Sequence, residues 1–154
     1  MSKCRSKVRC TCSIIALVFL IAGTANAAGD RMINKELEET IAKVRSEKSP
    51  MARTEAAEHL AELTDGVNPK SVNDKNLADM VALLDSPEDS VRAWVAAALG
   101  NLGRRAKVAI PKLLAMLPEA DCLRGDLTSA ASIRPALRRM GVKPPPPGCR
   151  AQSK

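Results

Sequence analysis

Aromatic side chains are nearly absent from this 154-residue chain, which contains one Phe, one Trp and no Tyr. Sheet sandwiches and barrels are normally rich in aromatic and β-branched residues, so this composition argues against an all-β fold. Alanine and leucine dominate instead, and both favour helix. We therefore expect an all-α protein, and the length fits one domain.

Histidine is almost as scarce, since His59 is the only one. Catalytic triads and Cys–His pairs would have to use it, and zinc sites usually recruit several His or Cys ligands. Its place beside Ala56 and Leu63 on a helical wheel predicts a half-buried packing residue. No glycine-rich phosphate loop or G-x-S-x-G element is present, and Cys10-x-Cys12 is only half a metal motif. We predict no enzymatic activity, no catalytic residue, no cofactor and no metal site.

The first 27 residues have the order of a secretory signal peptide. Four basic residues precede an apolar run from Ser13 to Gly23, and Ala25-Asn26-Ala27 fits the A-x-A cleavage rule. The run has 11 residues, whereas a helix needs about 20 to span a bilayer. We predict cleavage after Ala27 and a mature chain without a transmembrane segment, located in the periplasm or outside the cell.

Two cysteines, Cys122 and Cys149, remain after this cleavage. In an oxidising compartment they predict one disulfide, with a bridge between two chains as the alternative. The second cysteine lies in a proline-rich tail, residues 142–154. We hypothesise that an intrachain bridge straps this tail over the open end of the preceding domain.

The charges of the mature chain are segregated along the sequence. Its net charge is only +3, which is low for a nucleic-acid-binding protein. Residues 28–103 carry 9 basic and 14 acidic side chains, and residues 104–154 carry 11 basic and 3 acidic ones. Such a dipolar surface can steer a charged partner; ordinary solubilising charge is the alternative. We expect Glu58, Glu62, Arg134 and Arg138 to orient a partner, and the basic C-terminal end to make a weak contact with anionic surfaces.

Proline and glycine divide residues 28–141 into six expected helices. The second, fourth and sixth end in related ways, so that Leu60, Leu99 and Leu137 correspond at a period of about 38 residues. Such a period is typical of helical solenoids, in which stacked helix pairs bury a continuous core. The expected ranges are 31–47, 50–63, 73–84, 87–102, 106–117 and 125–140.

The stretch VALLDSPEDSVRAWVAAALGNLGRRAKVAIPKLLAML, residues 81–117, resembles the HEAT-like repeats of armadillo-type solenoids. The resemblance implies a short right-handed α-solenoid of about three antiparallel helix pairs and a role in protein binding, and it transfers no catalytic residue. Trp94 departs from the pattern, which prefers alanine there. In similar repeats the arginine at position 92 usually pairs with an acidic turn residue, here Asp85.

A strip of small residues on the fourth helix is expected to face away from the core. It would let a partner helix approach closely, and an aromatic anchor beside a small pocket is a common binding hot spot. The alternative is that neighbouring helices or the tail cover the strip. The expected contact residues are Ala93, Trp94, Ala97, Gly100 and Asn101, with Ala96 in the same strip.

The function predicted from the sequence is non-enzymatic binding of another protein, whose identity the sequence does not give. One alternative is an inhibitor or immunity protein for one cognate toxin or hydrolase. Another is electrostatic binding to envelope polymers or anionic lipid. An enzyme or enzyme subunit with a lyase-like role is disfavoured, because no nucleophile–base pair or cofactor site is visible.

Overall fold

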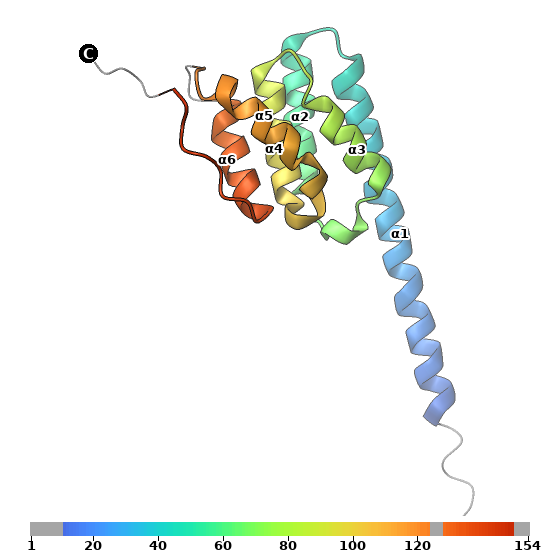
Figure 1. Ribbon diagram of the computed structural model, residues 1–154. Coiled ribbons are helices and arrows are strands. Elements are labelled where there is room, and N and C mark those ends of the chain that lie inside the picture. Colours follow the sequence, from blue (N-terminus) through green and yellow to red (C-terminus); the bar gives the residue numbers. More distant parts are fainter. Residues whose placement is uncertain (1–10, 124–127, 150–154) are drawn as a thin grey trace, which may run out of the picture. The chain divides into compact units, whose positions relative to one another are not determined.

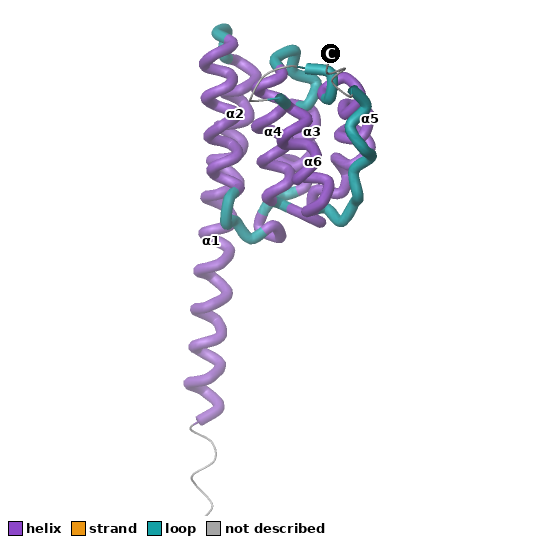
Figure 2. Tube along the Cα trace, turned by 90° about the vertical axis from the view of Figure 1, so that its left-hand side faces the viewer, coloured by secondary structure: helices purple, strands orange, loops and turns teal. Residues whose placement is uncertain are grey.

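A computed structural model describes residues 11–123 and 128–149 of the chain. Within these ranges every regular element is helical (Figures 1 and 2). The chain divides into two units, residues 1–32 and 33–154. The first contains the beginning of α1, Thr11–Ser46, and its residues 1–10, the basic start of the expected signal peptide, lie outside the described part.

Among the described residues of the second unit, five further α-helices and two 3₁₀-helices follow α1. The expected starts and ends agree within a few residues for most helices, but α1 begins well before residue 31 because the apolar segment is itself helical. The expected fifth helix begins later than residue 106, because a 3₁₀-helix occupies its first part. The elements are α2 Pro50–Thr64, η1 Pro69–Ser71, α3 Asp74–Leu83, α4 Asp89–Asn101, η2 Gly103–Ala109, α5 Ile110–Ala120 and α6 Ser129–Arg139.

The helix ends follow from local sequence. Pro50 occupies the first turn of α2, where its missing N–H needs no partner. The side chain of Asn73 accepts a hydrogen bond from the Asn76 amide and caps α3. Gly103 and Gly141 follow α4 and α6 with φ of 52° and 90°, a left-handed conformation that non-glycine residues rarely adopt. These glycines therefore end their helices as expected.

One hydrophobic core runs through the second unit. The three corresponding leucines, Leu60, Leu99 and Leu137, each have 0% exposure, so the repeat register is confirmed. α4 packs extensively against α2 on one side and α6 on the other, and Figure 1 shows the three helices in succession. The predicted all-α fold of stacked helix pairs is confirmed. Other large side chains that are buried from solvent are Leu37, Ile41, Met80, Leu84, Leu102, Leu113, Leu117, Ile133 and Met140.

Two arginines at equivalent repeat positions fasten the turns that precede α2 and α4. Arg53 Nη1 donates to the carbonyl oxygen of Glu47 at 2.8 Å, and Arg92 Nη1 donates to that of Ser86 at 3.0 Å. The expected partner of Arg92 was wrong, because Asp89, one helical turn away, contacts its guanidinium at 3.0 Å. Asp85 pairs with Lys112 Nζ instead, at 2.6 Å.

Candidate functional site

A shallow groove of about 300 Å³ lies on the exposed side of α2, α4 and α6. We call this surface the α2–α4–α6 face. Five of the residues expected to contact a partner meet in the groove, although they come from two different helices. Its lining residues are Glu58, Ala61, Glu62, Asp65, Trp94, Ala97, Asn101 and Arg139.

Ala61, Asp65 and Arg139 belong to the groove but were missed from sequence. Arg139 could have been found, because it lies two residues after Leu137, as Asn101 does after Leu99 and Glu62 after Leu60. Residues at equivalent repeat positions form a row across stacked helices. The repeat register therefore predicts a row of three side chains, in which the first is acidic, the second is an amide and the third is basic.

Asn101 and Arg139 hold the three helices together at their C-terminal ends. Asn101 Nδ2 donates to the Ala61 carbonyl oxygen at 3.0 Å, which joins α4 to α2. Arg139 Nη1 donates to Asn101 Oδ1 at 2.8 Å, which joins α6 to α4. Asn101 therefore lines the groove as expected, but its amide is already engaged in positioning the helices.

Ala93 and Gly100 are buried, so the expectation that they form an open strip was wrong. Ala93 is 1% exposed and Ala96 is 0% exposed. A Cβ atom placed on Gly100 would meet Ala136 Cβ at 2.9 Å, which shows how closely α4 and α6 approach. The small residues of α4 thus serve α4–α6 packing, and of the strip only Ala97 opens to the groove, beside Trp94.

Trp94 forms one wall of the groove and is half-buried against the core. Its indole Nε1 is shielded from solvent and has no hydrogen-bond partner among the described residues. A buried donor without a partner costs about 1–3 kcal/mol. The tryptophan therefore contributes apolar surface while its polar atom is unsatisfied.

We expect Trp94→Phe to leave the free energy of unfolding unchanged or to raise it by about 1 kcal/mol, because the ring stays and the unsatisfied donor goes. Trp94→Ala should lower it by roughly 2 kcal/mol, because buried ring surface is lost. Urea unfolding followed by circular dichroism measures both. Equal destabilisation by the two substitutions would contradict this account of the indole N–H.

The acidic side chains at the rim of the groove form few ion pairs with other described residues. Glu58 and Asp65 are exposed, and no ion pair joins either to another described residue. Glu62 Oε2 lies 3.4 Å from His59 Nδ1, whose side chain is 53% exposed. The expectation that His59 is half-buried was wrong, because α2 turns it towards solvent. Three carboxylates therefore give this edge of the face a negative potential.

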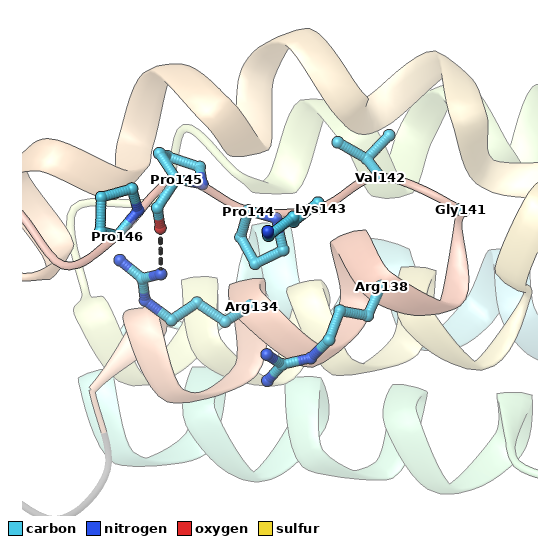
Figure 3. Close-up of a pocket in the computed structure, with 8 residues that line it drawn as sticks. All are labelled: Arg134, Arg138, Gly141, Val142, Lys143, Pro144, Pro145 and Pro146. Atoms are coloured by element: carbon cyan, nitrogen blue, oxygen red, sulfur yellow. Dashed lines mark hydrogen bonds between the residues drawn. The ribbon is translucent and has the colours of Figure 1, made fainter.

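The C-terminal tail is fastened along α6. Cys122 and Cys149 form a disulfide with a Cα–Cα distance of 5.2 Å, as predicted. Arg134 donates from Nη1 to the Pro145 carbonyl oxygen at 2.5 Å (Figure 3). Its Nη2 lies 2.6 Å from Asp121 Oδ2, which also accepts from the Gly148 amide at 2.9 Å.

Arg134 is therefore a structural residue. Its expected role in orienting a partner is not supported by its position, because its side chain is only 16% exposed and both ends of its guanidinium are engaged. Arg138 is exposed, and with Lys143 and the prolines it lines a cleft of about 560 Å³ between α6 and the tail. Figure 3 shows these side chains.

The Arg134 guanidinium lowers the pKa of Asp121 below its ordinary value of 3.8, and the Gly148 amide adds to the effect. Because the folded pKa lies below the unfolded one, this stabilisation is complete above about pH 4 and is lost as pH falls through the folded pKa. We expect Asp121→Asn to cost roughly 1.5 kcal/mol at neutral pH, as for hydrogen bonds to charged groups.

When the pH is lowered from about 4, Asp121→Asn should lose less stability than the wild type, because it has no carboxylate to protonate at this position. Thermal melts at a series of pH values would measure this. If the melting temperatures of the wild type and the variant fell equally steeply with pH below about pH 4, the assigned role of Asp121 would be contradicted. Asp74→Asn, at an exposed ion pair, is the matched control and should change stability little.

Neither a cluster of metal-ligating side chains nor a long apolar helix occurs among the described residues. Among them, no three His, Cys, Asp or Glu side chains converge so that they could hold a metal ion. In the same part of the chain, no helix has the length and apolar character that a bilayer crossing requires.

Comparison with known families matches one repeat, which includes most of the central helix of this face. Residues 91–117, which span most of α4, all of η2 and most of α5, match the PBS lyase HEAT-like repeat. No curated protein and no solved structure matches the chain. HEAT-like repeats are generally non-catalytic and commonly mediate protein binding. The match supports a HEAT-like repeat family through residues 91–117, and the described elements that flank this segment are helical as well.

Proposed function

We propose that the protein is an exported, non-enzymatic binding module that recognises another protein through the α2–α4–α6 face. The observation that carries this proposal is the groove itself, in which a half-buried tryptophan, a small alanine and three carboxylates meet. Trp is enriched among interface residues that contribute most to binding energy. A repeat of a type that commonly mediates protein binding supports the same role.

The construction of the face suits recognition. Hydrogen bonds from Asn101 and Arg139 hold α2, α4 and α6 at fixed spacing. Because the helices are tied to each other, the groove is largely formed before a partner arrives, and little ordering free energy is lost on binding. The small side chain of Ala97 leaves room beside Trp94 for an inserted partner side chain.

The proposed location outside the cytoplasm has two supports. The order of residues 1–27 is that of a signal peptide. The Cys122–Cys149 disulfide is of a kind that persists in oxidising compartments. Cell fractionation of the full-length product, followed by N-terminal sequencing, tests this: we expect a periplasmic or secreted chain beginning at Ala28. A cytoplasmic, uncleaved product would contradict it.

Affinity capture with the tagged full-length gene product tests the binding role. We would compare the wild type with a variant carrying Trp94→Ala and Ala97→Glu, which removes the anchor and fills the groove. A matched control carries Val108→Ala and Ala78→Glu, which make the same kinds of change at exposed positions outside the groove. All three proteins would first be compared by circular dichroism.

The expected result is one or more stoichiometric partners that the wild type and control retain and the groove variant loses. A single toxin or hydrolase among them would assign the narrower inhibitor role. Partners retained equally by all three would move the binding site away from the groove. Capture of neither a different protein nor an untagged second copy of the chain under any condition would contradict the proposed function.

A further inference from the structure

The three helices of the α2–α4–α6 face run in the same direction. At their N-terminal ends, Thr54 Oγ1 lies 2.8 Å from Ser90 Oγ, and the Asp89 carboxylate accepts from the Ser129 amide at 2.9 Å. At their C-terminal ends, Asn101 reaches Ala61 and Arg139 reaches Asn101. The N-terminal ends of the three helices therefore lie side by side, and so do their C-terminal ends.

The charges on this face are ordered across the helices. α2 contributes Glu58 and Glu62, and Asp65 follows it; α4 contributes the uncharged Trp94 and Ala97; and α6 contributes Arg139. The exposed Arg138 lies next to Arg139 at the edge of α6 that borders the tail, and it adds to the positive charge there. The acidic and basic edges lie near the same, C-terminal level of the helices. The face is thus negative along one edge, neutral and partly apolar in the middle, and positive along the other edge.

Such a pattern is complementary to itself. If a second copy is placed face to face by a two-fold axis parallel to α4, its α2 lies opposite α6 of the first copy, and C-terminal ends remain opposite C-terminal ends. Acidic residues then face arginines twice, and Trp94 faces the same residue of the other copy. A two-fold axis perpendicular to the helices would instead place α2 on α2 and α6 on α6 in antiparallel orientation, so that no acidic residue would face an arginine.

We propose that the partner this face fits is a second copy of the chain, in a two-fold symmetric dimer with α4 packed on α4. The inference rests on the proposed use of the α2–α4–α6 face for protein binding and names its partner. An isologous interface of this kind requires one self-complementary patch. Opposite electrostatic potentials across the interface favour the arrangement in which α2 of each copy faces α6 of the other.

The size of the face predicts a weak dimer. Helices of 11 to 15 residues at a rise of 1.5 Å are roughly 20 Å long. Three of them side by side at about 10 Å spacing give roughly 600 Å² per copy, or about 1,200 Å² in total. That lies at the lower limit of specific interfaces, so we expect a dissociation constant in the micromolar range that rises with salt because its charge pairs are exposed.

Charge reversal tests the dimer with the full-length gene product. One variant carries Glu58→Lys and Glu62→Lys, and the other carries Arg138→Glu and Arg139→Glu. All four positions are exposed, and circular dichroism melts would verify that both variants fold. In the proposed dimer each variant opposes like charges twice, so we expect self-association to weaken on the order of a hundredfold.

An equimolar mixture of the two variants should restore the dimer, because every reversed residue then faces a reversed partner of opposite charge. Sedimentation equilibrium measures the masses. Trp94 is the only tryptophan in the chain, so its fluorescence should also change on dilution of the wild type and of the mixture. A triple change away from the face, Glu36→Gln, Glu39→Gln and Asp74→Asn, should leave the wild-type dissociation constant unaltered.

A wild type that stays monomeric at about 1 mM, a dimer that both charge-reversed variants retain, or a mixture that fails to associate would each overturn the proposal. These outcomes are separate from failure of the proposed function. A monomeric protein that still captures a different partner through the groove would keep that function and remove only the second copy as its ligand.

Discussion

Cys149→Ser should lower the free energy of unfolding by about 3.5 kcal/mol, which is the chain-entropy value for a loop of this length. The disulfide joins residues 27 apart in sequence and encloses α6. Without it, the unfolded chain gains freedom and the tail depends on hydrogen bonds alone. Since total stability is typically about 5–15 kcal/mol, the melting temperature should fall by roughly 10 °C or more.

Differential scanning calorimetry of the wild type and the variant, with and without reductant, measures this effect. Reductant should lower the wild-type melting temperature to that of the variant and leave the variant unchanged. The double change Cys122→Ser and Cys149→Ser controls for a free thiol. Melting of Cys149→Ser at the wild-type temperature would contradict the strap hypothesis, in which the bridge stabilises the end of the helical stack.

The bridge was predictable because the sequence offered so few choices. If residues 1–27 are removed, only Cys122 and Cys149 remain. The hydrogen bonds of Arg134 and Asp121 that hold the tail were not predictable in the same way. Arg134 belongs to α6 and Asp121 follows α5, and no periodic pattern indicates that their side chains meet. The packing of α5 against α6 brings them together.

Helix identity and core register were readable from sequence because apolar residues recur with helical spacing and each repeat places its leucines alike. The faces of α4 were harder to assign. A helical wheel shows one apolar stripe, and it placed Ala93 and Gly100 on the side away from that stripe. In a stack, however, a middle helix has neighbours on both flanks. The small residues on its flank are therefore buried by the next helix, as Gly100 is by Ala136.

The groove was predicted in part for the same reason. Trp94, Ala97 and Asn101 lie on the side of α4 that no described helix covers, which is where the helical wheel placed Ala97 with Trp94 and Asn101 beside it. Arg92 shows where a family pattern gives the wrong partner. Asp89 is one turn away on the same helix, and this local pairing replaces the expected contact with Asp85.

Gly100→Leu should cost about 3 kcal/mol of stability, at the upper end of the usual range for overpacked cores. A Cβ atom at position 100 would lie 2.9 Å from Ala136 Cβ and 3.0 Å from Ala136 Cα. The obstructing atoms belong to the backbone of α6 and its first side-chain carbon, so no flexible side-chain end can move aside. α4 and α6 must therefore separate, which opens the core around Leu99 and Leu137.

Two comparisons make this prediction specific. Ala97→Leu enlarges a residue of the same helix by a similar volume but points into the groove, so it should change stability little. Gly100→Ala should still destabilise the protein, although alanine is the better helix former by about 1 kcal/mol. Adding Ala136→Gly should restore part of the lost stability, because it removes the Ala136 Cβ atom, which makes the closer contact. Urea unfolding of the single and double variants gives the coupling energy between the two positions. A coupling near zero, or a Gly100→Ala variant more stable than the wild type, would mean that α4 and α6 do not approach each other as closely as their packing here requires.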